Sequence, residues 1–337
     1  MATNGLTNTE LVEYLGLPES IIDELGTAQG TAYTSAKNEF LEALYNKVLY
    51  QTVYAMDFAN PFKKYDSFPV RYGDTIENIV VELPQGYKFD GNATDPFGKA
   101  VPVAKTLYAS INYEMQYQTT IQDVWIRRAV LSEYGFMNLI DTILATLSRS
   151  AVIDEYFGTI RALNNEAIFA EGFEEVEKGA DEKETAEIVT KKIVDVASSF
   201  TLPSKTNNAL GVMNVTAKDN VLLVIKRSVL NSINLDYLTG VYNLSKVDLV
   251  KNMIVVDTFQ VEQVNDGDDE VTLVGEDLDF MIIDERGFDN HVALQDGGMI
   301  YNPKGKYTNH FYNLWKIVSY KYFYNARAFK IVDSIGA

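Results

Sequence analysis

The sequence contains no cysteine, and only two of its 337 residues are histidines, His291 and His310. Without cysteine the protein cannot form disulfide bridges, zinc–thiolate sites or thiol nucleophiles. The two histidines do not have the spacing of paired metal ligands one helical turn apart. A Gly-x-Ser-x-Gly nucleophile motif and the Walker spacing of a phosphate-binding loop are also missing. We therefore expect no catalytic residue, no metal ligand, no cofactor-binding residue and no cofactor.

Long apolar runs are missing as well. No run reaches the ~18 residues that a membrane-spanning helix needs. The first five residues lack the basic region and apolar region that open a secretory signal. We expect a protein that has no membrane partner and that is made, and stays soluble, in a cytoplasm.

Positive charge is scarce in this chain. Lys and Arg number 29 against 47 Asp and Glu, which gives a net charge of -18. A protein that reads DNA sequence needs clustered Lys and Arg to neutralise phosphates, so the composition excludes that class. Aromatic side chains crowd residues 309–331 and could stack bases. The cations in and around that segment, Lys316, Lys321, Arg327 and Lys330, are scattered, which favours packing in a core or an interface.

Acidic side chains gather at residues 265–270, where a calcium-binding loop could be suspected. The spacing is wrong for an EF-hand, because Gly267 interrupts the acids directly and an apolar strand follows. We interpret the segment as a turn between strands. Carboxylates distant in sequence can still pair in space. A carbohydrate-acting enzyme with paired carboxylates therefore remains the alternative from a different functional class.

The N-terminal part is predicted to be helical. Residues 17–26 have Pro18 and acidic side chains at the start and Gly26 as a stop signal. Residues 33–54 place apolar side chains at spacings of three and four, which predicts an amphipathic helix. The members of this stripe are Phe40, Leu41, Leu44, Val48 and Leu49. The stripe must be buried, either in the chain's own core or on another copy of the chain.

An extended hairpin is predicted next. Residues 75–83 and 106–118 alternate with period two, as strands do, and the polar segment 84–103 lies between them. A hairpin with little apolar surface of its own is marginal in water. It therefore needs a platform, which is either a neighbouring copy or its own domain.

The longest predicted helix begins at Phe136 and continues to Leu163. One face of it carries Leu139, Ile140, Ile143, Leu144, Leu147 and Ala151. Gly158 is expected to bend or end it. Residues 171–187 are strongly acidic and predict a solvated loop, and residues 187–200 predict a further helix. Strands and helices then alternate over residues 212–280, as in a compact α/β lobe.

The order of elements in the later part of the chain is the most informative feature. An apolar strand, a helix, a second apolar strand and an aromatic strand follow one another. The segments that carry this order are residues 219–225, 226–238, 243–249, 253–259, 279–288, 301–307 and 309–331. This order resembles the major capsid protein of a tailed bacteriophage with the HK97 fold, most like those of small podoviruses that infect Gram-positive bacteria. The resemblance is one of pattern over most of the chain, without a single invariant motif.

The resemblance implies an α+β fold with five segments. An N-terminal helical arm would occupy residues 1–60, and the E-loop hairpin region would occupy 61–121. A P-domain with the long spine helix and a sheet would occupy 122–200. An A-domain would occupy 201–300. Residues 301–337 would return to the P-domain.

The resemblance also implies a function. The chain would be a structural protein that assembles with itself into hexamers and pentamers of an icosahedral phage head, located in the virion and synthesised in the host cytoplasm. Portal and scaffolding proteins would be partners, and packaged double-stranded DNA would be contacted without sequence preference. An acidic inner wall is compatible with holding DNA that does not adhere. An encapsulin-type cargo shell is the alternative within the same fold.

Some capsids of this fold join a Lys of the hairpin to an Asn of a neighbour. Lys88, Lys99 and Lys105 lie in the hairpin region, and Asn302 and Asn325 lie near the end of the chain. Such residues are common, so the sequence does not assign this chemistry to them.

Overall fold

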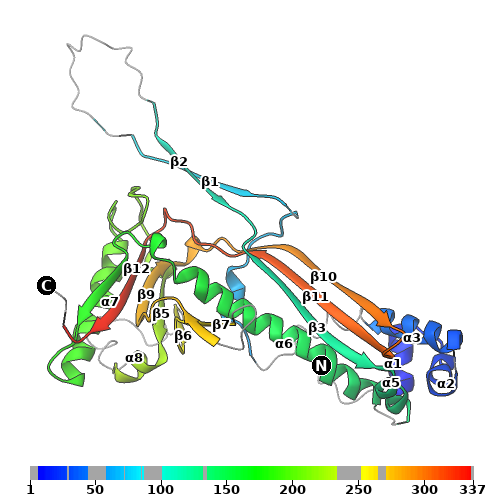
Figure 1. The fold of residues 1–337 in the computed structure, drawn as a ribbon. Helices are drawn as coiled ribbons and strands as arrows, with labels where there is room; N and C mark the ends of the chain where they lie inside the picture. Colours follow the sequence, from blue (N-terminus) through cyan, green and yellow to red (C-terminus); the bar gives the residue numbers. More distant parts are fainter. Residues whose placement is uncertain are drawn as a thin grey trace. The chain divides into compact units, whose positions relative to one another are not determined.

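The computed structural model describes most of the chain, in several stretches. These are residues 7–28, 30–44, 58–71, 73–84, 86, 101–131, 135–233, 252–264 and 271–334. The chain forms two compact units (Figure 1). The first consists of Met1–Asn60, Tyr113–Tyr156 and Ala293–Lys316, and the second consists of Pro61–Asn112, Phe157–Val292 and Ile317–Ala337.

Short helices make up much of the first unit. They are α1 (Asn8–Leu15), α2 (Ser20–Thr27), α3 (Gly30–Leu44) and α5 (Asp123–Val130). A capping box starts α1, because the Thr7 hydroxyl accepts a hydrogen bond from the Glu10 N–H while the Glu10 side chain accepts one from the Thr7 N–H. Gly26 was predicted to stop a helix, but it lies inside α2. A Cβ there would come within 3.3 Å of Val130 of α5, so glycine allows these two helices to approach closely.

The apolar stripe of the N-terminal helices is buried within the chain. Of the predicted stripe, Phe40 and Leu41 are buried, and other apolar side chains of the N-terminal helices are buried with them: Leu11, Val12, Leu15, Ile21, Leu25, Tyr33 and Ala36. For these residues the interpretation that the stripe is covered by the chain's own core is confirmed, and the interpretation that a neighbouring copy covers it is wrong. The reason is that α2 packs against both α3 and α5. Val48 and Leu49 lie outside the described residues, as does the side chain of Leu44.

A sheet runs beside these helices in the order β10-β11-β3. Its strands are β3 (Tyr113–Gln122), β10 (His291–Asn302) and β11 (Tyr307–Ile317). β11 pairs antiparallel with β3, from Tyr307 opposite Gln122 to Lys316 opposite Tyr113. Every second side chain of β11 is buried, which is the period of a strand with one covered face.

The second unit contains a mixed sheet of five strands in the order β4-β12-β9-β5-β6. The strands are β4 (Phe173–Glu177), β5 (Val221–Lys226), β6 (Met253–Val256), β9 (Phe280–Asp284) and β12 (Ala326–Val332). β12 is parallel to β4 and antiparallel to β9, and β5 is antiparallel to β9 and parallel to β6. All five residues of β9 are buried, as expected for a central strand covered on both faces.

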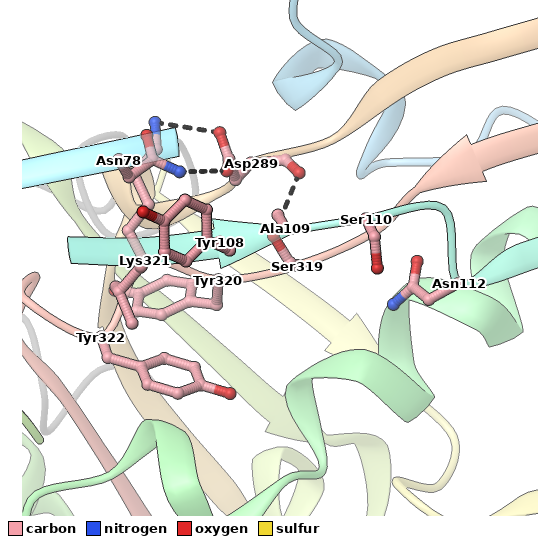
Figure 2. Close-up of a pocket in the computed structure, with 11 residues that line it drawn as sticks. Asn78, Tyr108, Ala109, Ser110, Asn112, Asp289, Ser319, Tyr320, Lys321 and Tyr322 are labelled. Atoms are coloured by element: carbon pink, nitrogen blue, oxygen red, sulfur yellow. Dashed lines mark hydrogen bonds and ion pairs between the residues drawn. The ribbon is translucent and has the colours of Figure 1, made fainter. Parts of the chain in front are cut away.

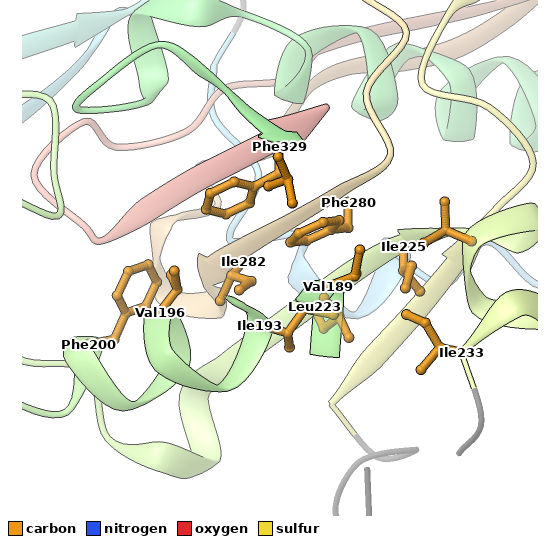
Figure 3. Packing of buried hydrophobic residues seen from close by; sticks show 12 residues of the cluster. Val189, Ile193, Val196, Phe200, Leu223, Ile225, Ile233, Phe280, Ile282 and Phe329 are labelled. Atoms are coloured by element: carbon orange, nitrogen blue, oxygen red, sulfur yellow. The ribbon is translucent and has the colours of Figure 1, made fainter. Parts of the chain in front are cut away.

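Helix α7 (Glu182–Phe200) covers one face of this sheet, and α8 (Arg227–Ser232) follows β5. Figure 3 shows side chains of α7 directed at strands β5, β9 and β12. Phe280 and Phe329 stack at the centre of this core, with ring centroids 4.8 Å apart and an interplanar angle of 21°.

The second unit also holds two antiparallel hairpins. They are β1 (Ile76–Val81) with β2 (Ala104–Ala109), and β7 (Val261–Val264) with β8 (Val271–Val274). Short 3-10 helices occupy Lys63–Tyr65, Glu166–Ile168, Lys218–Asn220 and Glu285–Gly287.

The longest helix is α6 (Gly135–Leu163), as predicted from Phe136. Gly158 neither ends nor interrupts it. Leu147 and Ala151 of the predicted apolar face are buried. The side chains of Leu139, Ile140, Ile143 and Leu144 lie outside the described residues.

Two local predictions were wrong. The acidic segment 171–187 is not a loop throughout, because it contains β4 and the start of α7. The guanidinium of Arg327 donates to the carboxylates of Glu171 and Glu174, which compensates the acidic charge beside that edge strand. The predicted strand 106–118 is divided between β2 and β3. Asn112 makes the break, because its side chain donates to the Val318 carbonyl and accepts from the Val318 N–H.

Replacing Phe329 by Ala should destabilise the unassembled subunit by ~3–5 kcal/mol, because it leaves a cavity against Phe280 in a fully buried site. Urea unfolding measures this loss. The exposed Leu273 is the matched control, and its replacement by Ala should cost less than ~0.5 kcal/mol. Equal losses for the two variants would contradict this placement of the core.

Candidate functional site: a projecting hairpin

The hairpin β1–β2 forms a separate ribbon that extends away from the five-stranded sheet of its unit (Figure 1). Its register runs from Ile76 opposite Ala109 to Val81 opposite Ala104. The Glu82 N–H donates to the Val103 carbonyl at 2.8 Å, which continues the ribbon beyond the assigned strands. The sequence predicted this hairpin, although its second strand is shorter than predicted. The predicted tip, residues 84–103, falls mostly outside the described residues, and Lys88 and Lys99 with it.

One face of the hairpin carries a row of exposed aliphatic side chains, named here the apolar row. It consists of Ile79, Val81 and Leu83, whose exposed fractions are 57%, 52% and 69%. Ile79 and Val81 alternate along β1, and Leu83 continues the alternation just beyond its end, so the three lie on the same face. Val101, which precedes β2, and Tyr108 of β2 are also exposed, at 76% and 70%. Contiguous exposed apolar groups are characteristic of interaction surfaces.

The opposite face of the hairpin is held by polar contacts at its base (Figure 2). The Asn78 side chain donates to the Asp289 carboxylate at 2.6 Å. Further along the ribbon, the Lys105 ammonium donates to the Leu210 carbonyl at 2.6 Å and pairs with Glu82 at 2.9 Å. The base of the hairpin is therefore fixed to its own unit, while the apolar row faces away from it.

A cavity of about 250 Å³ lies at the hairpin base, between β2 and residues 319–322. Its only lining carboxylate is Asp289, whose oxygens already contact Asn78, His291 and Lys321. Two opposed carboxylates are what glycoside hydrolysis needs. This cavity therefore gives no support to the enzyme alternative. Among the described residues, no group of three His, Asp or Glu side chains is placed to hold a metal ion.

A buried ion pair links the N-terminal helices of the first unit to α5. The Lys37 ammonium lies 3.1 Å from the Asp123 carboxylate and 3.3 Å from the ring centre of Tyr301. The Tyr301 hydroxyl donates to the other oxygen of Asp123 at 3.1 Å. Burial lowers the pKa of Lys37, while the hydrogen bond to Asp123 opposes that shift. Sequence reasoning missed this site, because nothing local marks residue 37 as a buried lysine.

The two histidines occupy different surroundings. His310 is buried on the inward face of β11, and burial, with a smaller contribution from Lys37, lowers its pKa to about 4. His291 is buried in the second unit beside Asp289, at 3.1 Å. Neither is part of a metal cluster within the described ranges.

The other residues considered as functional candidates from the sequence make contacts within the fold. Asn325 is fully buried and donates to the Thr216 hydroxyl, and Asn302 donates to the Tyr307 hydroxyl at 2.7 Å. Tyr320 and Phe329, from the aromatic segment, are buried in the core, which agrees with packing rather than base stacking. The acidic turn 265–270 lies outside the described residues, but the strands on its two sides, β7 and β8, pair antiparallel.

Across the stretches that are described, no helix has the length and apolar character needed to cross a membrane.

The fold defines the class of protein. The structure matches the capsid of Staphylococcus phage Andhra with a TM-score of 0.61, over 82% of this chain and 86% of that chain, at 12% identity. This is the HK97-like fold of phage capsids, and the predicted fold is confirmed.

The chain belongs to the Phi29-like phage major capsid protein family, whose sequence model matches residues 19–330. The major capsid protein of Streptococcus phage Cp-1 is 28% identical over 308 residues, which cover 86% of this chain and 81% of that protein. The major capsid protein of Bacillus phage B103 is 27% identical over 310 residues. That match covers 90% of this chain and 66% of the B103 protein. The resemblance read from the order of elements is thereby confirmed.

The burial of His310 predicts a pH dependence. Its folded-state pKa of about 4 lies below the usual 6.5, so the unfolded chain takes up the proton first as the pH falls. Stability is therefore unaffected above pH 6.5 and is lost between pH 6.5 and 4, by up to ~3 kcal/mol. Urea unfolding of the His310→Gln variant should show a correspondingly smaller loss over this range. Parallel pH profiles for the two proteins would contradict the prediction.

Proposed function

We propose that copies of this chain assemble into hexamers and pentamers of an icosahedral head that encloses double-stranded DNA. The observation that carries the proposal is the apolar row, which the described part of the chain leaves exposed while the opposite face of the same ribbon is anchored. Burying an aliphatic side chain of this kind contributes roughly 1.5–3 kcal/mol. A neighbouring copy is the platform that such a ribbon requires.

The contact would be heterologous, because the hairpin of one copy would meet a different surface on the next. Such head-to-tail contacts close into rings when the rotation between copies allows it. Each copy both offers a hairpin and receives one. Rings of five and six copies are then built from the same contact.

The five segments inferred from the sequence are kept as proposals. Residues 61–121 would form the E-loop region, and the hairpin β1–β2 lies within it. Residues 122–200 would form the P-domain, which includes α6, and residues 201–300 would form the A-domain. The return of residues 301–337 to the P-domain is supported by the pairing of β12 with β4. Residues 1–60 would be the N-terminal helical arm.

The proposed partners follow from assembly. Scaffolding and portal proteins would join the copies during head formation, in the cytoplasm of the host where the chain is made. Packaged DNA would be contacted without base readout, because the net charge of -18 repels phosphate at long range. The role is structural, and no catalytic step is proposed.

Changing the apolar row should block assembly without unfolding the subunit. In the double variant Ile79→Ser and Val81→Ser, both positions are more than half exposed, so the free energy of unfolding should change by less than ~1 kcal/mol. Particles counted by electron microscopy should fall sharply.

The matched control is Leu202→Ser, which removes an equally exposed leucine from a loop outside the hairpin. It should leave the particle count close to that of the unchanged protein. Normal particle yield from the apolar-row variant would refute the proposed role of the hairpin.

DNA binding by unassembled subunits should be weak and independent of sequence. Within the ~10 Å over which charge acts at moderate salt, only local cations can offset the acidic balance. Any retention on DNA should therefore vanish as salt is raised, and fluorescence anisotropy with two unrelated duplexes checks this. Sequence-selective binding that persists at physiological salt would contradict the prediction.

A further inference from the structure

We infer that Asp289 is a positioning residue that sets the direction in which the hairpin leaves its unit. The inference rests on the proposed role of the hairpin as the contact between copies. Four residues form the device, named here the hairpin anchor: Asn78, Asp289, His291 and Lys321. Figure 2 shows Asn78 and Lys321 beside the Asp289 carboxylate at the base of the hairpin.

The carboxylate of Asp289 is the centre of the anchor. Its side chain is 3% exposed, and both oxygens have polar partners. One oxygen accepts a hydrogen bond from Asn78 at 2.6 Å, and the other forms an ion pair with Lys321 at 3.2 Å and lies 3.1 Å from Nε2 of His291. A buried carboxylate is tolerated only with such partners. The position of the Asp289 carboxylate is therefore fixed by His291 and Lys321, independently of its hydrogen bond to Asn78 of the hairpin.

His291 connects the anchor to the segment that precedes β1. Its Nδ1 lies 2.9 Å from the Phe68 carbonyl, and its Nε2 faces the Asp289 carboxylate. The imidazole therefore lies between the Phe68 carbonyl and the Asp289 carboxylate. The Phe68 ring also meets the edge of the imidazole, at 4.7 Å between centroids. The anchor thus holds the approach to the hairpin as well as its first strand.

The anchor fixes the orientation of the whole hairpin through contacts near one end of it. Asn78 is the third residue of β1, and the other polar attachment that the described contacts give to this face is that of Lys105 to the Leu210 carbonyl. Val80, the partner of Lys105, is two residues beyond Asn78, so the two attachment points are roughly 7 Å apart along the strand. A small rotation between points so close moves the distant part of the ribbon by much more.

Removing the Asn78 attachment leaves the Lys105 contact as the remaining polar attachment that the described residues give to this face of the ribbon. A hydrogen bond to a charged group is strong enough that its loss should raise the population of other orientations by ~10-fold or more. The apolar row would then reach the neighbouring copy at a wrong angle. Assembly would fail through geometry, although the row itself is intact.

Spin-label distances test the inference directly, because the chain has no cysteine of its own. Thr106→Cys on the hairpin and Lys191→Cys on α7 place labels at two exposed positions of the second unit. In unassembled subunits, Asn78→Ala should widen the distance distribution, and so should Asp289→Asn. Asn78 is only partly buried, so Asn78→Ala keeps the test valid if the Asp289 variant does not fold.

Tyr108→Phe is the matched control. It removes the hydrogen bond from the Tyr108 hydroxyl to Glu77, which joins the two strands on the exposed face one residue from Asn78. This variant should keep the narrow distribution. An equally narrow distribution for Asn78→Ala would overturn the inference, as would equal widening in Tyr108→Phe.

Failure of the inference is distinguishable from failure of the proposed function. If Asn78→Ala keeps a narrow distribution while the apolar-row variant still blocks assembly, the anchor has no positioning role and the hairpin contact stands. If the apolar-row variant assembles normally, the proposed contact fails whatever the distances show. A widened distribution together with a ~10-fold lower yield of closed particles supports both.

Discussion

A two-stranded ribbon buries too little apolar surface to be stable in water by itself. This constraint accounts for the arrangement around the hairpin β1–β2. On one face the ribbon is attached by Asn78 and Lys105 to its own unit, and on the other it leaves Ile79, Val81 and Leu83 in solvent. The unit behind the ribbon is a well-packed mixed sheet covered by α7. The exposed face of the ribbon is the surface that the proposed neighbouring copy would cover.

Buried charges recur in this chain, and each has a partner of opposite sign. Lys37 pairs with Asp123, Lys316 pairs with Glu155, and Lys321 pairs with Asp289. Breaking such a pair leaves an uncompensated charge and typically costs 3–5 kcal/mol, although the intact pair adds little net stability. These pairs therefore specify which segments meet. Specific attachment matters in a subunit whose surfaces must match those of identical neighbours.

Much of the fold could be predicted from the sequence because its signals are local. The unbroken apolar run of β9 and the helical period of α6 stand out without any knowledge of their neighbours. β4 was missed because its acidic side chains are compensated by Arg327, 153 residues from Glu174. The break at Asn112 was missed because a side-chain amide there takes the place of a backbone pairing. The hairpin anchor could not be predicted, since Asn78 and Asp289 are 211 residues apart and neither has a local pattern.

The position of β12 in the five-stranded sheet has a consequence for synthesis. β4 is made first, yet its neighbour in the sheet is β12, which is made after all the other strands of that sheet. Until residues 326–332 have been made, the acidic edge of β4 has no strand to pair with and Phe280 has no Phe329 to stack on. Contacts between segments so distant in sequence form slowly, because a long loop must close first. The five-stranded sheet is therefore completed late, and Lys321 of the hairpin anchor, which lies just before β12 in the chain, is also made late.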